Sequence, residues 1–398
     1  MKLLHTADWH LGQTFFEYDR KAEHQQFLAW LATQVKAPDI DVLLIAGDVF
    51  DNPNPAAESQ RIFYKFLHEV TSGNPQLQIV IIAGNHDSAA RLEAPDPLLE
   101  EMHVTVRGTV KRTNEGGIDY RHLIVPLLDG AEVAAWCLAV PYLRQGDYPE
   151  AENYVQGVGK MYQTLYGMVP DKTKPVIVMG HLQATGSEIS ENDRSERTII
   201  GGLECVSPDA FPPEIAYVAL GHLHRAQRVS GRENVRYAGS PLPMSFAEKD
   251  YKQGVTLVEL TECRTTIERL VFEAPVKLLR ISAPLSETLE QIALLPDGEI
   301  TPHSPYLEVK VLITEPEPSL RHQIEEALKG KSVRPARIAA VTPKIKNESK
   351  TITYEEWQTI NPMDMATDIF RRRFGGEAMP EAMRQLLQTV VREVDLKK

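Results

Sequence analysis

The chain has 398 residues, of which 42% are hydrophobic and 25% charged, as in an ordinary globular protein of two or three domains. Cys137, Cys205 and Cys263 lie far apart, and the sequence shows neither a secretory signal nor an apolar run near the roughly 20 residues of a membrane helix. We therefore expect no disulfide framework, no membrane association and a cytoplasmic location. The formal net charge of −12 disfavours nucleic acid as a partner unless a basic surface is local, a partner protein supplies one, or bound cations offset ligand carboxylates.

Five short apolar runs each end in a polar side chain of a kind that binds metal ions. The runs are Lys2–Ala7 before Asp8, Asp41–Gly47 before Asp48, Ile79–Gly84 before Asn85, Pro175–Gly180 before His181, and Ala216–Gly221 before His222. Runs this short, bounded by small residues, predict buried strands that end in tight loops. Because ligands bind at the carboxyl ends of strands in open α/β sheets, we expect the five ends to meet.

The segment 1–272 is expected to form one α/β domain in which strands alternate with helices. Apolar stripes at helical spacing run from Glu23 to Val35 and, after Pro55, from Ile62 to Val70. Core packing and a dimer contact both explain these stripes. The polar stretch Gly186–Gly202 is typical of a surface loop near the site. The β-rich segment Val235–Phe272 is expected to form a second sheet, which would give a sandwich with outer helices.

The segment 276–343 is expected to form a small α+β domain with no cluster of chemically active residues. Strands are predicted at Lys277–Ala283, Tyr306–Ile313 and Val333–Val341. A short helix carries Leu320, Ile324 and Leu328 and stops at Gly330, and prolines punctuate the connections.

The segment 352–398 predicts a helical hairpin. Asn361–Pro362 begins its first helix, Gly375–Gly376 breaks that helix, and Pro380 begins the second. A hairpin this small cannot bury two apolar stripes alone, so it docks on the rest of the chain or captures a partner helix or coiled coil. The run Arg371–Arg373 lies in the last turn of its helix, where the dipole favours cations; DNA contact is the alternative.

The residue types at the strand ends indicate a metal centre. Aspartate, asparagine and histidine together suit divalent ions of the Mn, Fe or Zn kind, and the lack of cysteine ligands argues against structural zinc. Two ions about 3.5–4 Å apart can activate a water and stabilise both oxygens of an in-line phosphoryl displacement. His86, oriented by Asp87, can protonate a leaving alkoxide. The loop after Gly221 must turn if His222 and His224 are both to reach one site.

The motifs together resemble a known superfamily. Asp8-x-His10, Gly47-Asp48, Gly84-Asn-His-Asp87, Gly180-His181 and Gly221-His-x-His224 are similar to those of calcineurin-like metallophosphoesterases. The sequences around these motifs look like those of bacterial SbcD nuclease subunits. They are His5-Thr-Ala-Asp-Trp-His-Leu-Gly12, Gly47-Asp-Val-Phe-Asp51, Gly221-His-Leu-His-Arg225 and Tyr237-Ala-Gly-Ser-Pro241. The similarity covers most of the chain.

The resemblance implies a β-sandwich flanked by helices, a small capping domain that faces DNA, and a tail hairpin that grips the coiled coil of an SbcC-type ATPase. One ion would be held by Asp8, His10, Asp48 and His224, and the other by Asp48, Asn85, His181 and His222. Mn²⁺ is the implied ion, with Mg²⁺ as the alternative. Two copies would form a homodimer within a two-plus-two complex that acts in DNA repair and recombination at the nucleoid. The implied activity is 3′ to 5′ exonuclease on duplex ends, with endonuclease on single strands and hairpins.

One departure and two alternatives accompany the resemblance. Archaeal and eukaryotic relatives carry a histidine where this chain has Asp51, so any role of that histidine cannot be transferred. A phosphatase or cyclic-nucleotide phosphodiesterase could use the same metals, and a non-catalytic scaffold would lack ligands that are all present here. Arg20, Arg61 and Arg91 lie near the motifs and are DNA-contact candidates or ordinary surface charges.

Overall fold

The computed structural model describes residues 1–36, 40–187, 205–261, 264–313 and 317–342, with isolated positions between 367 and 385. The chain divides into two compact units, Met1–Thr342 and Pro343–Lys398. The hairpin predicted for 352–398, with its run Arg371–Arg373, lies almost entirely outside the described residues. Most of the predicted loop Gly186–Gly202 lies outside them as well.

A first six-stranded sheet carries three of the five predicted site strands. Its order is β14 (Thr265–Val271), β13 (Gly254–Leu260), β1 (Lys2–Thr6), β4 (Val42–Ala46), β5 (Gln78–Ile82) and β6 (Val104–Arg107). The strands β1, β4, β5 and β6 are parallel, whereas β13 is antiparallel to both of its neighbours. Every residue of β4 is buried, as expected for a parallel strand that is covered on both faces.

A second six-stranded sheet carries the other two site strands. Its order is β11 (Gln227–Val229), β12 (Arg232–Tyr237), β10 (Tyr217–Gly221), β9 (Val176–His181), β8 (Glu132–Ala139) and β7 (Ile124–Asp129). The two sheets share an apolar core in which Leu44 and Val80 of the first sheet join Ile177 and Ala219 of the second. The predicted sandwich is therefore confirmed.

The composition of the two sheets differs from the prediction in one respect. Of the β-rich segment Val235–Phe272, only β12 belongs to the second sheet, whereas β13 and β14 extend the first. The reason is that β13 pairs with β1 along its length, from Lys2 opposite Glu259 to His5 opposite Thr256. The second sheet takes β7 and β8 from a part of the chain for which no strands were predicted.

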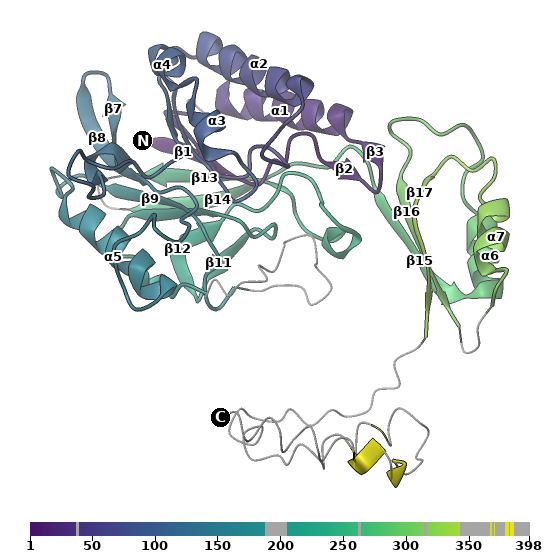
Figure 1. The fold of residues 1–398 in the computed structure, drawn as a ribbon. Helices are drawn as coiled ribbons and strands as arrows, with labels where there is room; N and C mark the ends of the chain where they lie inside the picture. The colour runs from purple at the N-terminus through teal and green to yellow at the C-terminus, as the bar shows by residue number, and fades with distance from the viewer. Residues whose placement is uncertain are drawn as a thin grey trace. The chain divides into compact units, whose positions relative to one another are not determined.

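Helices cover both outer faces of the sandwich (Figure 1). The first sheet is covered by α1 (Lys21–Lys36) and α2 (Ala57–Gly73), and the second by α5 (Tyr154–Gly167). The predicted stripes lie in the core under the first sheet, as the core-packing interpretation expects, although Ile62 is only partly buried. None of the helices in the described ranges is long and apolar enough to cross a membrane.

Short elements connect the larger ones. They are β2 (Thr14–Phe15), β3 (Tyr18–Asp19), α3 (Ala89–Glu93), α4 (Asp96–Leu99), and the 3₁₀ turns η1 (Glu100–Met102), η2 (Tyr120–Leu123), η3 (Pro208–Ala210) and η4 (Phe246–Glu248).

The segment after 276 forms a small sheet with its own core. The elements are β15 (Leu278–Pro284), α6 (Leu285–Ala293), β16 (Tyr306–Leu312), α7 (Leu320–Ala327) and β17 (Arg334–Val341). The strands are parallel in the order β15-β16-β17, and each crossover contains one helix. The three strands and α7 match the prediction, whereas α6 was not predicted. Tyr306 Oη of β16 donates a 2.7 Å hydrogen bond to Glu23 Oε1 of α1, which ties the small sheet to the sandwich.

Candidate metal centre

The loops after β1, β4, β5, β9 and β10 meet at one end of the sandwich and bring the predicted ligands together. The backbone N–H of His222 donates a 2.9 Å hydrogen bond to Asp8 Oδ1, across 214 positions of sequence. Asn85 Oδ1 lies 3.0 Å from His181 Nε2 and 3.1 Å from His222 Nδ1. His181 Nε2 also lies 3.3 Å from Asp48 Oδ2. Side chains from both sheets therefore share one buried site.

Three overlapping trios of described side chains have the spacing of metal ligands, and two of them contain only predicted ligands. The third joins His86 to His10 and Asp48. The ligand atoms of Asp8, His10 and His224 all lie within 4.8 Å of one another, as do those of Asp8, Asp48 and His181. Asp48 Oδ2 also lies 3.7 Å from His10 Nε2 and so faces the first trio. This position suits the bridging role that the family resemblance implies for Asp48.

The donor set fits a pair of divalent ions. Asp8 Oδ2 and His10 Nε2 are buried and have no hydrogen-bond partner among the described residues. Buried polar atoms are nearly always paired, and a cation would pair both of these. Carboxylate and amide oxygens mixed with imidazoles, without thiolates, suit ions such as Mn²⁺.

The backbone at the ligands is held in an uncommon conformation. Asp8, His10, Asp48 and His222 all have positive φ, between 47° and 99°. Such conformations cost about 1–3 kcal/mol each for ordinary residues and concentrate at functional sites. The φ of 99° at His222 turns the chain after β10, which is how both His222 and His224 reach the site.

Two glycines let the strand ends approach closely. A Cβ atom on Gly84 would lie 2.1 Å from Asp48 Oδ1, and one on Gly47 would lie 2.3 Å from His181 Nδ1. Side chains at either position would displace a predicted ligand. The glycines before Asp48 and Asn85 are thus a packing requirement of the site itself.

Charge is unevenly distributed over the buried ligands. Burial alone would raise the pKa of Asp48, but the imidazoles of His181, His10 and His86 hold it well below its usual range. Burial alone would lower the pKa of His181, but the carboxylates of Asp48 and Asp8 raise it to about 9. The opposite shifts of the two pKa values are those of a buried ion pair between Asp48 and His181.

His86 stands at the edge of the ligand set. Its backbone N–H donates a 2.8 Å hydrogen bond to Asp48 Oδ1, and its Nδ1 lies 2.8 Å from the carbonyl oxygen of Asp51. Its ring centroid is 4.8 Å from that of His10. This imidazole therefore lies beside the centre, at a position suited to proton transfer.

Asp87 does not have the surroundings expected of the residue that orients His86. Its carboxylate is buried and accepts hydrogen bonds from the backbone N–H groups of Val49, Phe50 and Gly84, at 2.9–3.2 Å. It therefore joins the loop after β4 to the loop after β5. Among the described residues, the Asp51 carbonyl is the hydrogen-bond partner of the His86 ring.

The three predicted DNA-contact arginines lie in different environments. Arg20 is fully buried, and its guanidinium binds Glu23, Gln13 Oε1 and the carbonyl oxygen of Pro243. It is a structural residue, and we do not propose it as a DNA contact. Arg61 and Arg91 are exposed; Arg61 lies 3.4 Å from Glu58 and Arg91 donates to Asn54 Oδ1.

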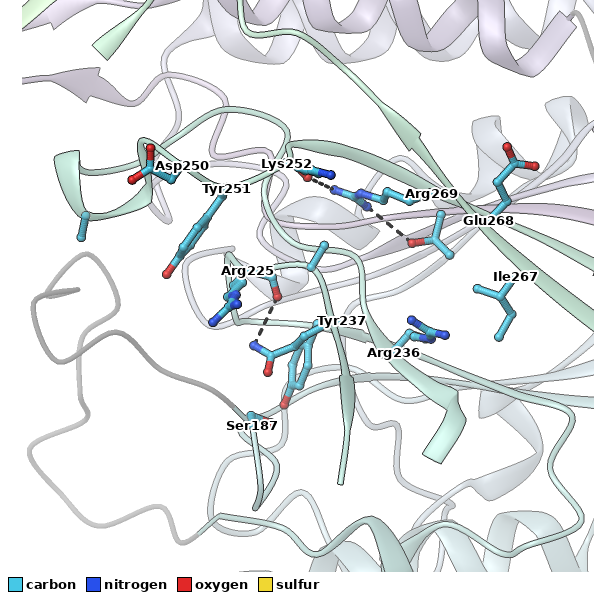
Figure 2. A pocket seen from close by; sticks show the side chains of 14 residues that line it. Ser187, Arg225, Arg236, Tyr237, Asp250, Tyr251, Lys252, Ile267, Glu268 and Arg269 are labelled. Carbon is cyan, nitrogen blue, oxygen red and sulfur yellow. Dashed lines mark hydrogen bonds between the residues drawn. The ribbon is translucent and has the colours of Figure 1, made fainter. Parts of the chain in front are cut away.

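A cationic cleft begins directly after the last predicted ligand. Arg225 follows His224, and it lines a cavity of about 1040 Å³ together with Arg236, Lys252 and Arg269. Two acids, Asp250 and Glu268, line the same cavity, so its cations outnumber its acids by four to two. Figure 2 shows these side chains around the cleft, with Arg269 hydrogen-bonded to the Lys252 carbonyl at its rim. The cleft lies between β12 of the second sheet and β14 of the first, along the open side of the sandwich. It was not predicted, because its cations are spread from 225 to 269 and form no run.

Comparisons with known proteins place the chain in a family. Residues 1–226 match the calcineurin-like phosphoesterase family, and residues 274–377 match a family described as type 5 capsule protein repressor C-terminal domain. The SbcD component of the SbcCD nuclease of Rhodobacter capsulatus is 39% identical over 361 residues, which cover 86% of this chain and 88% of that protein. The chain belongs to the SbcD family of calcineurin-like phosphoesterases.

Other SbcD relatives extend the similarity. The SbcD component of the SbcCD nuclease of Escherichia coli K12 is 29% identical over 404 residues, covering 98% of this chain and 96% of that protein. Its counterpart in Bacillus subtilis is 35% identical over 268 residues, covering 65% of this chain and 66% of that protein. As an SbcD-family metallophosphoesterase, the chain is a hydrolase that acts on ester bonds and uses divalent metal ions.

Proposed function

We propose that this chain is the nuclease subunit of an SbcCD-type complex and hydrolyses phosphodiester bonds in DNA. The observation that carries the proposal is the pair of ligand trios built from Asp8, His10, Asp48, His181 and His224. The predicted set is completed by Asn85 and His222. We propose Mn²⁺ as the working ion, with Mg²⁺ as the alternative.

The chain's own residues divide the work. Two divalent ions, when bound, activate a water and stabilise the oxygens of the in-line displacement. Asp48 would hold both ions, with the other six ligands divided between them. His86 donates Nδ1–H to the Asp51 carbonyl, and in its imidazolium form it would also carry a proton on Nε2. We propose that this Nε2 proton passes to the leaving alkoxide and leaves a neutral imidazole.

We propose that DNA lies along the cationic cleft. The whole chain is acidic, whereas this cleft beside His224 has four cations, Arg225, Arg236, Lys252 and Arg269, against two acids, Asp250 and Glu268. This local excess of positive charge is what a DNA-binding surface requires. Lys252→Gln is expected to reduce the slope of log K against log salt concentration for DNA binding by about 1, the value for one lost phosphate contact. Arg264→Gln is the control, since Arg264 is exposed and lines a different cleft with Met1 and Lys174. Equal salt dependence in both variants would contradict this path.

The domains would have separate roles. We propose that 1–272 is the nuclease domain, that 276–343 caps it and faces DNA, and that the tail 352–398 binds the coiled coil of an SbcC-type ATPase. Two copies would form a homodimer in a two-plus-two complex. Deleting residues from about 350 onward should leave model-ester hydrolysis intact and abolish co-purification with the ATPase. Co-purification of the truncated chain would contradict this role for the tail.

The decisive experiment compares DNA substrates. The full chain, with and without its ATPase, is incubated with duplex, hairpin and single-stranded DNA in Mn²⁺ or Mg²⁺. We expect 3′ to 5′ degradation of duplex ends and internal cleavage of single strands and hairpins, all abolished by a chelator. Preference for a phosphomonoester over a phosphodiester model compound would instead favour a small-molecule phosphatase of the same superfamily.

A further inference from the structure

Glu248 is a fully buried acid beside a predicted metal ligand. Its Oε1 lies 3.2 Å from His224 Nδ1, and the exposed fractions of the two side chains are 0% and 4%. Its Oε2 accepts a 2.8 Å hydrogen bond from the backbone N–H of Met244. Both carboxylate oxygens are thus engaged, which fixes the direction of the group.

The turn that carries Glu248 is itself held in place. Ser245 Oγ caps η4 by accepting from the N–H of Ala247 at 3.2 Å. The ring of Phe246 packs against Phe15, with 5.2 Å between centroids. The carbonyl oxygen of Phe246 accepts a 2.8 Å hydrogen bond from Arg280 Nη2 of β15. Glu248 is therefore positioned by both the sandwich and the small sheet.

We propose that Glu248 is the positioning residue for His224 and sets which ring nitrogen binds the metal ion. A carboxylate only accepts hydrogen bonds, so His224 Nδ1 carries the proton. That tautomer has its lone pair on Nε2, which becomes the metal-binding nitrogen. A buried carboxylate in this place fixes the ring and raises its basicity. The inference rests on the proposed function only in taking His224 as a ligand.

The other predicted histidine ligands have different partners. His181 Nδ1 lies 2.8 Å from the Ala46 carbonyl oxygen, and His222 Nδ1 lies 3.1 Å from Asn85 Oδ1. His10 Nδ1 lies 3.4 Å from Asp51, whose side chain is 33% exposed. Among these four histidines, only His224 has its Nδ1 against a buried carboxylate that is not itself a predicted ligand. The effect of Glu248 should therefore fall on the ion held by Asp8, His10 and His224.

The test is a Mn²⁺ titration followed by electron paramagnetic resonance on the full-length chain. Glu248→Gln is expected to weaken one of two Mn²⁺ sites by about 10–100-fold and leave the other unchanged. The control is Glu93→Gln, because Glu93 Oε1 also lies 3.2 Å from a histidine nitrogen, His122 Nε2, outside the centre. Wild-type affinity at both sites in Glu248→Gln, or an equal loss in Glu93→Gln, would overturn the inference.

Two further measurements separate this inference from the ligand set. If the wild-type chain fails to bind two Mn²⁺ ions, the proposed centre itself is wrong. If it binds two, Glu248→Gln should cause no further loss of Mn²⁺ affinity in a chain that already carries His224→Ala, because Glu248 acts through His224. Should Glu248→Gln not fold, nitrogen-15 spectra of the wild-type histidines provide the test. The signal of His224 is the one that disappears in His224→Gln, and it should show the proton on Nδ1. A proton on Nε2 would overturn the inference.

Discussion

At the scale of single residues, Asp48 and His86 have separable tasks. Asp48 faces both ligand trios, so Asp48→Ala should abolish hydrolysis and lower the binding of both ions. Mn²⁺ at 100 times its Kd should stabilise the wild-type chain by about 2.7 kcal/mol, and Asp48→Ala should lose most of this stabilisation. The measurement is thermal unfolding with and without Mn²⁺. Retention of both ions by Asp48→Ala would remove the bridging role.

His86→Ala should separate catalysis from metal binding. The imidazole is held by the Asp51 carbonyl rather than by a predicted ligand side chain, so its loss should spare metal occupancy. Loss of a general acid typically lowers turnover by about 10²–10⁴-fold. The check is metal content together with kcat on a phosphodiester, and an activated leaving group that needs no proton should restore much of the rate. No rescue by such a leaving group would contradict the role.

At the scale of elements, the strands are joined across the sandwich by a buried histidine. His5 Nδ1 of β1 lies 2.9 Å from Tyr217 Oη of β10, with the two rings edge to face. Burial, assisted by the cation of Arg269, lowers the pKa of His5 to about 3. The unfolded chain takes up a proton near pH 6.5, whereas the folded chain does not until about pH 3. This contribution to stability is complete above pH 6.5 and decreases as the pH falls.

The expected result is a weaker acid sensitivity when His5 is removed. The slope contributed by one such group is at most about 1.4 kcal/mol per pH unit. His5→Gln should flatten the dependence of the unfolding free energy on pH between about 6.5 and 4, measured by urea unfolding. His303→Gln, at an exposed position, should keep the wild-type slope. Identical slopes for the wild type and His5→Gln would contradict the assignment.

The elements also show what local pattern can predict. All five site strands and the stripes of α1 and α2 were predictable. A strand that is buried on both faces appears in the sequence as a short apolar run, and a helix that is buried on one face appears as apolar residues at helical spacing. The sheet to which β13 and β14 belong was not predictable. Pairing with β1 is a contact between the two ends of the domain, and no local period records it. Helix α6 was missed because it begins at Leu285 directly after β15 ends at Pro284, with no connecting loop between them.

At the scale of the whole unit, the small sheet is joined to the sandwich by a buried hydrogen bond. Tyr306 donates to Glu23, and the guanidinium of Arg334 lies 3.7 Å from the Tyr306 ring centroid. Tyr306→Phe should lower the unfolding free energy by about 1.5–3 kcal/mol, since it removes a bond to a buried charge. Tyr18→Phe is the control, because its 3.2 Å bond to the Pro335 carbonyl oxygen is only partly buried. Equal losses of unfolding free energy in the two variants, measured by urea unfolding, would show that the buried bond stabilises the unit no more than the partly buried one.

The sequence by itself determined the chemistry of the centre. The kinds of ligand, their order along the chain and the glycine before most of them are local features that follow from how a strand ends in a tight loop. Only the tertiary structure decided what each side chain contacts. It buries Arg20 in the domain, turns Asp87 toward backbone amides, gathers scattered cations into the cleft and places Glu248 against His224. These outcomes depend on packing between distant segments, and such contacts leave no period or spacing in the sequence.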